Sequence, residues 1–221
     1  TTEIYTLSLH DALPILQYGV VSQLQDDPLG EYRVMVKLPI VNSEEQGIWC
    51  RVATLDAGNN RGSFFLPEIG DEVLVGFINE DPNNAVIFGM LNSSAKPAPI
   101  KAEDANNIKG FVTRSELKFL FDDEKKSVTI ETPAGKKITI DEDADEISLQ
   151  DEHSNTLKMN KDGVSIESGK DLVLKATGDV TIEGMNIEIT GQAEVKASGN
   201  AGTEVSSSAT TTIKGSIVQI N

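Results

Sequence analysis

Few residues in this chain could support chemistry at a reactive centre, and His153 is the first to consider. It is one of two histidines in 221 residues, and the other, His10, lies in a segment treated below as non-native. His153 stands in the polar run Asp151-Glu152-His153-Ser154-Asn155, which is typical of a solvated turn. A Ser-His-Asp triad remains an alternative, but nothing in the sequence orients one. The chain also lacks a P-loop, an HExxH motif and a Cys/His cluster, so we expect no catalytic residues and no cofactor.

The acidic stretch that begins at Asp141 is the best candidate for a cation site. Asp141, Asp143 and Asp145 stand at positions 1, 3 and 5 of a calcium-binding loop, and Glu152 stands at position 12. Position 6 of such a loop needs glycine for its sharp turn, but the chain has Glu146 there. The flanking residues alternate as strands do. We therefore predict an ordinary charged turn and no metal, with a calcium site as the alternative.

Charge and cysteine content exclude several classes of function. The chain has 35 acidic and 19 basic residues and a formal net charge of −16. Such a surface repels nucleic acid and anionic lipid, because phosphate binding needs clustered Lys and Arg. Cys50 is the single cysteine, which excludes an intrachain disulfide, and we expect it to be a buried small hydrophobe. No stretch approaches the roughly 18 apolar residues of a membrane-spanning helix.

The elements that would position these residues are short strands, and the second half of the chain repeats them. Pairs of the form apolar-x-apolar recur about every seven to ten residues, separated by Gly, Asp and Ser-rich turns, which is typical of a β-solenoid or fibre. The pairs are Val128/Ile130, Ile138/Ile140, Ile147/Leu149, Leu157/Met159, Val164/Ile166, Leu172/Leu174, Val180/Ile182 and Ile187/Ile189.

These repeats cannot build a sizeable core within one chain. Burial of an aliphatic side chain stabilises by roughly 1.5–3 kcal/mol, whereas ordering the backbone costs roughly 1–2 kcal/mol for every residue. Two apolar side chains per repeat do not offset that cost. The pattern therefore predicts association, most simply of identical chains around a shared axis.

The first half of the chain has a different composition and predicts a small barrel. Most of the aromatic residues, which make up 5% of the chain, lie before residue 122. Five short strands with turn-rich separators and no helical period are typical of an OB-fold. An OB-fold that binds nucleic acid is disfavoured by the acidic surface. The predicted strands are 16–24, 32–38, 47–53, 71–78 and 85–91.

Residues 1–15 differ from the rest in origin. Their sequence, TTEIYTLSLHDALPI, is the in-frame translation of a common short-read sequencing adapter. We therefore treat residues 1–15 as a non-native segment and leave them out of fold reasoning. The alternative is a genuine short amphipathic helix or signal. We expect the native sequence to extend upstream of residue 16.

Several segments together resemble the spike proteins of contractile injection systems. These are Gly19-Val20-Val21, the run 32–36 (YRVMV), the run 49–53 (WCRVA) and, most specifically, the run 61–77 (RGSFFLPEIGDEVLVGF). The chain resembles the VgrG proteins of type VI secretion systems and the equivalent baseplate spikes of contractile phage tails. The resemblance covers residues 17–221.

The resemblance implies an all-β fold with an N-terminal OB-fold barrel followed by an intertwined trimeric β-helix, or needle. The corresponding domains are 16–91, a linker at 92–107, and the needle at 108–221. The apolar pairs from Val128/Ile130 to Ile187/Ile189 would form the trimer core.

The resemblance also implies a function and partners. The chain would be a non-enzymatic homotrimeric spike that pierces a target envelope. It would be assembled in the bacterial cytoplasm and then secreted or injected, or be part of a phage-like particle. A PAAR-repeat tip protein would dock near Ile217, Val218 and Ile220. Hcp-like tail-tube and baseplate proteins would bind through an upstream hub domain that is absent here, and effectors are further possible partners. The alternatives are a phage baseplate spike, or a trimeric β-helical tail-fibre enzyme that degrades polysaccharide.

Overall fold

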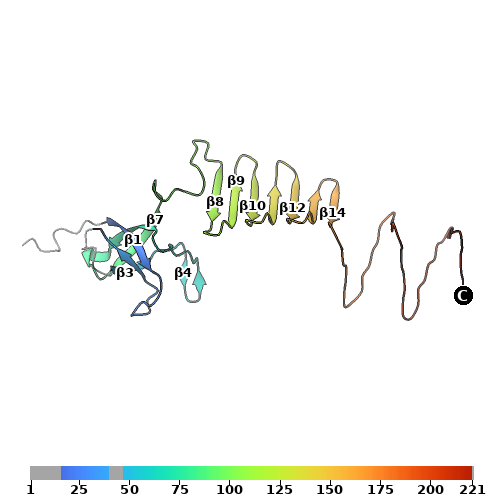
Figure 1. The fold of residues 1–221 in the computed structure, drawn as a ribbon, viewed down its shortest axis with the longest axis horizontal. Coiled ribbons are helices and arrows are strands. Elements are labelled where there is room, and N and C mark those ends of the chain that lie inside the picture. Colours follow the sequence, from blue (N-terminus) through green and yellow to red (C-terminus); the bar gives the residue numbers. More distant parts are fainter. Residues whose placement is uncertain (1–15, 40–46, 221) are drawn as a thin grey trace, which may run out of the picture. The chain divides into compact units, whose positions relative to one another are not determined.

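The computed structural model describes residues 16–39 and 47–220 and begins with a closed five-stranded barrel (Figure 1). The strand order is β1-β2-β3-β7-β6, with β3 parallel to β7 and the other pairs antiparallel. The strands are β1 (Leu16–Gln23), β2 (Val34–Lys37), β3 (Ile48–Val52), β6 (Glu72–Phe77) and β7 (Ala85–Leu91). Each predicted strand of the first half is therefore present, with ends that differ by up to two residues. No helix in the described residues is long and apolar enough to cross a membrane.

Alternating side chains fill the barrel interior. Val21, Val36, Val73 and Ile87 are almost completely buried, as is Cys50, which confirms its interpretation as a core residue. Burial raises the pKa of the Cys50 thiol to about 12. On β1, the absence of a side chain at Gly19 lets β2 pack closely, because a Cβ there would lie 2.4 Å from Val36 Cγ1.

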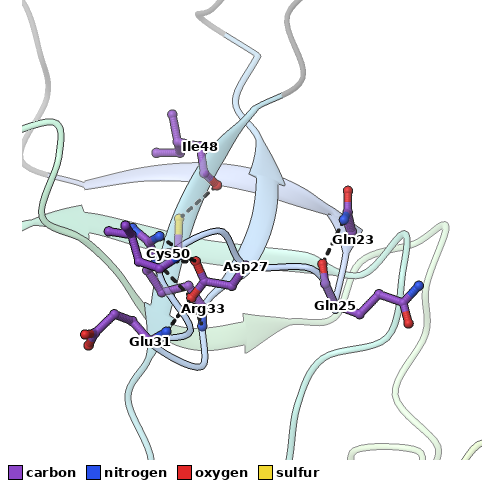
Figure 2. Close-up of polar contacts among 8 residues, drawn as sticks. Gln23, Gln25, Asp27, Glu31, Arg33, Ile48 and Cys50 are labelled. Atoms are coloured by element: carbon purple, nitrogen blue, oxygen red, sulfur yellow. Dashed lines mark hydrogen bonds and ion pairs between the residues drawn. The ribbon is translucent and has the colours of Figure 1, made fainter.

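An ion pair fixes the connection between β1 and β2 (Figure 2). The Asp27 carboxylate accepts hydrogen bonds from the backbone N–H groups of Leu29, Glu31 and Arg33, and from the Arg33 guanidinium. The Arg33 hydrogen bond holds the pKa of Asp27 well below its usual range, and the same contact raises the pKa of Arg33. The side chains are only 8% and 15% exposed, so this loop is tied to the barrel wall.

A small hairpin that the sequence analysis did not predict lies between β3 and β6. Its strands are β4 (Ala57–Gly58) and β5 (Arg61–Gly62), and Arg61 pairs with Asp56 at 2.7 Å. From sequence alone, this segment belongs to a turn-rich separator between two predicted strands. A two-residue strand carries too few side chains to produce a detectable alternation.

After the barrel, seven consecutive strands form one antiparallel meander (Figure 1). Each strand pairs with the next through a short turn, and left-handed residues such as Asp145 and Gly163 make the turns tight. Each of these strand pairs joins neighbouring segments of the same chain. The strands are β8 (Ile108–Val112), β9 (Lys118–Asp122), β10 (Ser127–Glu131), β11 (Lys137–Asp141), β12 (Glu146–Gln150), β13 (Thr156–Asn160) and β14 (Gly163–Glu167).

The remaining described residues, 170–220, form a separate unit without strand or helix. The sequence pattern predicts strands here at Leu172/Leu174, Val180/Ile182 and Ile187/Ile189. In the single chain these pairs have no hydrogen-bonded neighbour strand, because none of these segments folds back on another as β8–β14 do. The predicted needle thus divides into a part that pairs within the chain and a part that does not.

Candidate functional site: an apolar sheet face

The strand register of the meander places apolar side chains in two continuous rows on one face. Val128 lies opposite Phe121 and Ile140, and Ile130 lies opposite Phe119 and Ile138. The same pairing continues to Leu157 opposite Ile166 and Met159 opposite Val164. Ten of the predicted core residues share this face: Val128, Ile130, Ile138, Ile140, Ile147, Leu149, Leu157, Met159, Val164 and Ile166.

This apolar face is exposed in the single chain. Ile140 is 51% exposed and Val164 is 68% exposed, whereas Val73 in the barrel core is 0% exposed. A contiguous exposed apolar surface of this kind marks an interaction site in a soluble protein.

From β10 to β14 the opposite face of the same sheet is polar, whereas β8 and β9 place Ile108, Val112 and Leu120 on it. Its central row carries Thr129, Thr139, Ser148 and Lys158, and these residues are half-buried. At the sheet edge Lys118 faces Glu131 across β9 and β10, with 3.8 Å between Nζ and Oε1. The sheet is therefore amphipathic. Its polar face is suited to contact with water, and its apolar face is suited to contact with another apolar surface.

The other predicted core residues lie beyond the meander. Leu172, Leu174, Val180, Ile182, Ile187 and Ile189 are all more than half exposed. The predicted tip-docking residues Ile217, Val218 and Ile220 are 83%, 50% and 90% exposed. In a single chain neither set is gathered into a core.

The acidic stretch forms the turn between β11 and β12 and does not form a calcium loop. The Asp141 carboxylate accepts the backbone N–H of Ala144, while Glu152 lies in the following turn and pairs with Lys136. The Lys136 hydrogen bond lowers the pKa of Glu152. Across the part of the chain that the structure describes, no group of three or more His, Cys, Asp or Glu residues could hold a metal ion.

His153 lies in the turn between β12 and β13, with its side chain 74% exposed. The structural role in that turn belongs to Asp151 and Asn155, which the sequence analysis did not single out. Asp151 accepts the Asn155 side-chain amide at 2.7 Å, and this bond lowers the pKa of Asp151. Asn155 in turn accepts Ser168 Oγ at 2.9 Å and the Gly169 N–H at 3.1 Å. This network ties the end of β14 to the preceding turn.

Three phenylalanines of the apolar face were missed by the sequence analysis. Phe111 on β8 lies opposite Phe119 on β9, and Phe121 shares the face. Phe119 and Phe121 follow the same alternation as the aliphatic pairs, so the signal was present in the sequence. The composition of the chain assigns aromatic residues to the barrel half, which hides this signal.

The closed five-stranded barrel is of the OB-fold class, and comparison with known families supports this assignment. Residues 17–91 match the family described as the type VI secretion system/phage-baseplate injector OB domain. Those residues contain all five strands of the barrel except Leu16. The predicted OB-fold is therefore confirmed, and the meander fits a β-helix-like region.

Curated relatives narrow the class further. The chain is 36% identical over 63 residues to the type VI secretion system spike protein VgrG3 of Vibrio cholerae serotype O1. It is 32% identical over 74 residues to the spike protein VgrG1a of Pseudomonas aeruginosa, and 38% identical over 56 residues to VgrG4b of the same organism. The matches cover 28%, 34% and 25% of this chain, and the chain spans 6%, 12% and 7% of those relatives. Together these matches support the resemblance to the VgrG and baseplate spike family that the sequence predicts.

Proposed function

We propose that this chain is part of a non-enzymatic, homotrimeric spike of a contractile injection system, of the type VI secretion kind. The observation that carries this proposal is the exposed apolar face of β8–β14. A single sheet layer with one apolar face cannot remain exposed to water at no cost, since burial of apolar area is the main force in folding and association. Copies of the same sheet would supply the missing layer.

The number of three copies comes from the resemblance to the spike family, which implies a trimeric β-helix. Three amphipathic sheets with their apolar faces turned inward would enclose a shared core of two side-chain rows per chain, and their polar faces would meet water. Two copies stacked as a sandwich would also bury the rows. The number of copies is therefore the first quantity to measure.

Residues 170–220 support an intertwined continuation of the spike. Backbone N–H and C=O groups need partners, and strands that do not pair within one chain obtain them from neighbouring chains. The apolar pairs Leu172/Leu174, Val180/Ile182 and Ile187/Ile189 continue the rhythm of the meander. Three chains wound together would pair these backbones and bury these side chains, with no open sheet edge left along the shaft.

The proposed action is mechanical. A rigid narrow shaft transmits the force of sheath contraction to a small tip, and no bond chemistry is required. A PAAR-repeat protein would cover the apolar end at Ile217, Val218 and Ile220, and Hcp-like tube and baseplate proteins would bind upstream of the barrel. The spike would assemble in the bacterial cytoplasm and leave it by secretion or injection, with effectors attached.

The test is the solution mass of the chain by light scattering, at low concentration and again in mild denaturant. A trimer that resists dissociation supports the proposal. A chain that stays monomeric at every concentration contradicts it, because the apolar face would then have no partner of its own kind.

A further inference from the structure

Aromatic side chains gather at one end of the apolar face. Phe111 and Phe119 lie opposite each other on β8 and β9, and the Phe119 and Phe121 ring centroids are 4.9 Å apart. The later strands β10–β14 carry only aliphatic residues and Met159 in these rows. The first hairpin of the sheet therefore differs chemically from the rest of the face.

A loop of the barrel reaches this aromatic end. Phe65, which follows β5, stacks on Phe111 with ring centroids 5.3 Å apart and planes 15° apart. Close by, Arg114 Nη1 donates to Glu68 Oε2 at 2.8 Å. Two separate contacts thus join the loop 63–69 to the first hairpin of the sheet.

The stacked pair remains half uncovered. Phe65 is 59% exposed and Phe111 is 50% exposed although each ring covers part of the other. Two large aromatic rings held in a fixed stack offer a rigid apolar contact, the type of residue that dominates the energetics of interfaces.

We infer that the barrel loop 63–69 forms part of the interface between copies of this chain, with the Phe65–Phe111 pair packing against the aromatic end of a second copy. This inference rests on the proposed self-association of the spike. The occupant is a second copy because Phe111 begins an apolar row that runs across all seven strands, beside a second apolar row that runs from Phe121 on β9 to Val164 on β14. A partner that covers those rows must carry apolar residues at the spacing of neighbouring strands, about 4.8 Å, and an identical sheet does so.

The consequence is that association involves both domains. A second copy that packs on Phe65 and Phe111 contacts a residue of the barrel loop and a residue of the sheet at once. Assembly of the sheets would then hold the loop between β5 and β6 in place, so that barrel and sheet assemble as one unit.

The test compares two substitutions in the full chain, Phe65→Glu and Phe88→Glu. Phe88 is a matched control because it is 57% exposed on the outer surface of barrel strand β7 and is not part of the apolar sheet face. We expect Phe65→Glu to raise the concentration at which the assembly dissociates by about tenfold or more, since it places a charge against a desolvated aromatic contact. Phe88→Glu is expected to leave it unchanged. Light scattering across a dilution series measures both.

The outcomes separate this inference from the proposed function. If the unsubstituted chain never assembles, the proposed function fails and this inference fails with it. If the chain assembles and Phe65→Glu dissociates no more readily than Phe88→Glu, only the role of the loop is wrong. Fluorescence of Trp49 on β3 reports whether the barrel stays folded in each variant. If Phe65→Glu unfolds it, the milder Phe65→Ser replaces it in the same comparison.

Discussion

Thr139 and Ile140 are neighbours in the chain whose side chains lie on opposite faces of the meander. Thr139 lies on the polar face of the meander, opposite Thr129 and Ser148. Ile140 lies on the apolar face, opposite Val128 and Ile147, and is 51% exposed. A charge introduced at each of the two positions disturbs the same strand, but only the charge at Ile140 lies on the proposed interface.

We predict that Ile140→Asp disrupts the assembly and that Thr139→Asp does not. In the proposed spike, one Asp from each copy would meet in an apolar core, and an unpaired buried carboxylate costs several kcal/mol, roughly 3–5 by analogy with broken buried ion pairs. The mass of each variant, measured by light scattering, checks the prediction. An Ile140→Asp chain as massive and as resistant to dilution as the parent would show that this face is not the interface.

The sequence predicts in part which residues lie on the apolar face. The alternation of apolar and polar residues indicates strands, and it groups Val128 with Ile130 or Ile138 with Ile140. It does not indicate which pairs share one sheet. That depends on the register between strands, which the turns decide. The role of these residues in a trimer core stays a prediction.

At the scale of elements, the connection between β1 and β2 shows how a polar pair shapes the barrel. Asp27 lies at the start of the loop and Arg33 at its end, and their ion pair closes it against the barrel. The Asp, Pro and Gly residues at 26–30 belong to one of the turn-rich separators that the sequence predicts between strands. The sequence does not predict the ion pair, because the pairing requires the chain to fold back on itself before β2.

We predict that Asp27→Asn lowers the stability of the barrel at neutral pH and flattens its acid dependence. The folded-state pKa of Asp27 is below its unfolded value, so its contribution is present above the unfolded pKa of about 3.9 and is lost as pH falls toward the folded pKa. The urea midpoint of barrel unfolding, followed by Trp49 fluorescence from pH 7 to pH 3, measures this. The difference between parent and variant should narrow as pH falls.

Asp26→Asn serves as the control for this experiment. Asp26 is the exposed neighbour of Asp27 and has a left-handed backbone, which Asn tolerates as well as Asp. It should unfold with the pH dependence of the parent. A constant difference between Asp27→Asn and parent at every pH would contradict the proposed electrostatic origin.

For the whole molecule, Gly169 separates strands that pair within the chain from a segment that forms no strand. The strands up to Glu167 pair within the chain, and residues 170–220 form no strand of their own. If residues 170–220 intertwine with other copies, their amides gain partners only on assembly.

Hydrogen exchange of the assembled chain tests this directly. We predict slow exchange of amides throughout 170–220 as well as in β8–β14, because strands from neighbouring chains would protect the former. Fast exchange of 170–220 in an assembly that protects β8–β14 would contradict the intertwined continuation. With that result, the interface between copies would consist of the apolar face of the meander alone.

The proposed docking of a tip protein at Ile217, Val218 and Ile220 leads to a second prediction for the whole molecule. Deletion of 216–221 removes Ile217, Val218 and Ile220, so it should leave the oligomeric mass unchanged and abolish retention of a co-expressed PAAR-repeat protein. Size-exclusion chromatography of the mixture, with the parent chain as control, measures both. Retention of the tip protein by the shortened chain would show that it docks elsewhere.

The sequence by itself determined the barrel strands, the strands from Val128 to Ile166, and the division between an aromatic barrel half and a repetitive half. The strands that it predicts beyond residue 170 are absent from the single chain, and the need for partners stays a prediction. These inferences follow from local alternation and from the small number of apolar residues in each repeat. Tertiary structure alone decided that β8–β14 pair within one chain, that their apolar residues form two unbroken rows, and that Phe65 of the barrel stacks on Phe111 of the sheet. Register and contacts between distant residues depend on how the turns bring segments together, which local pattern does not encode.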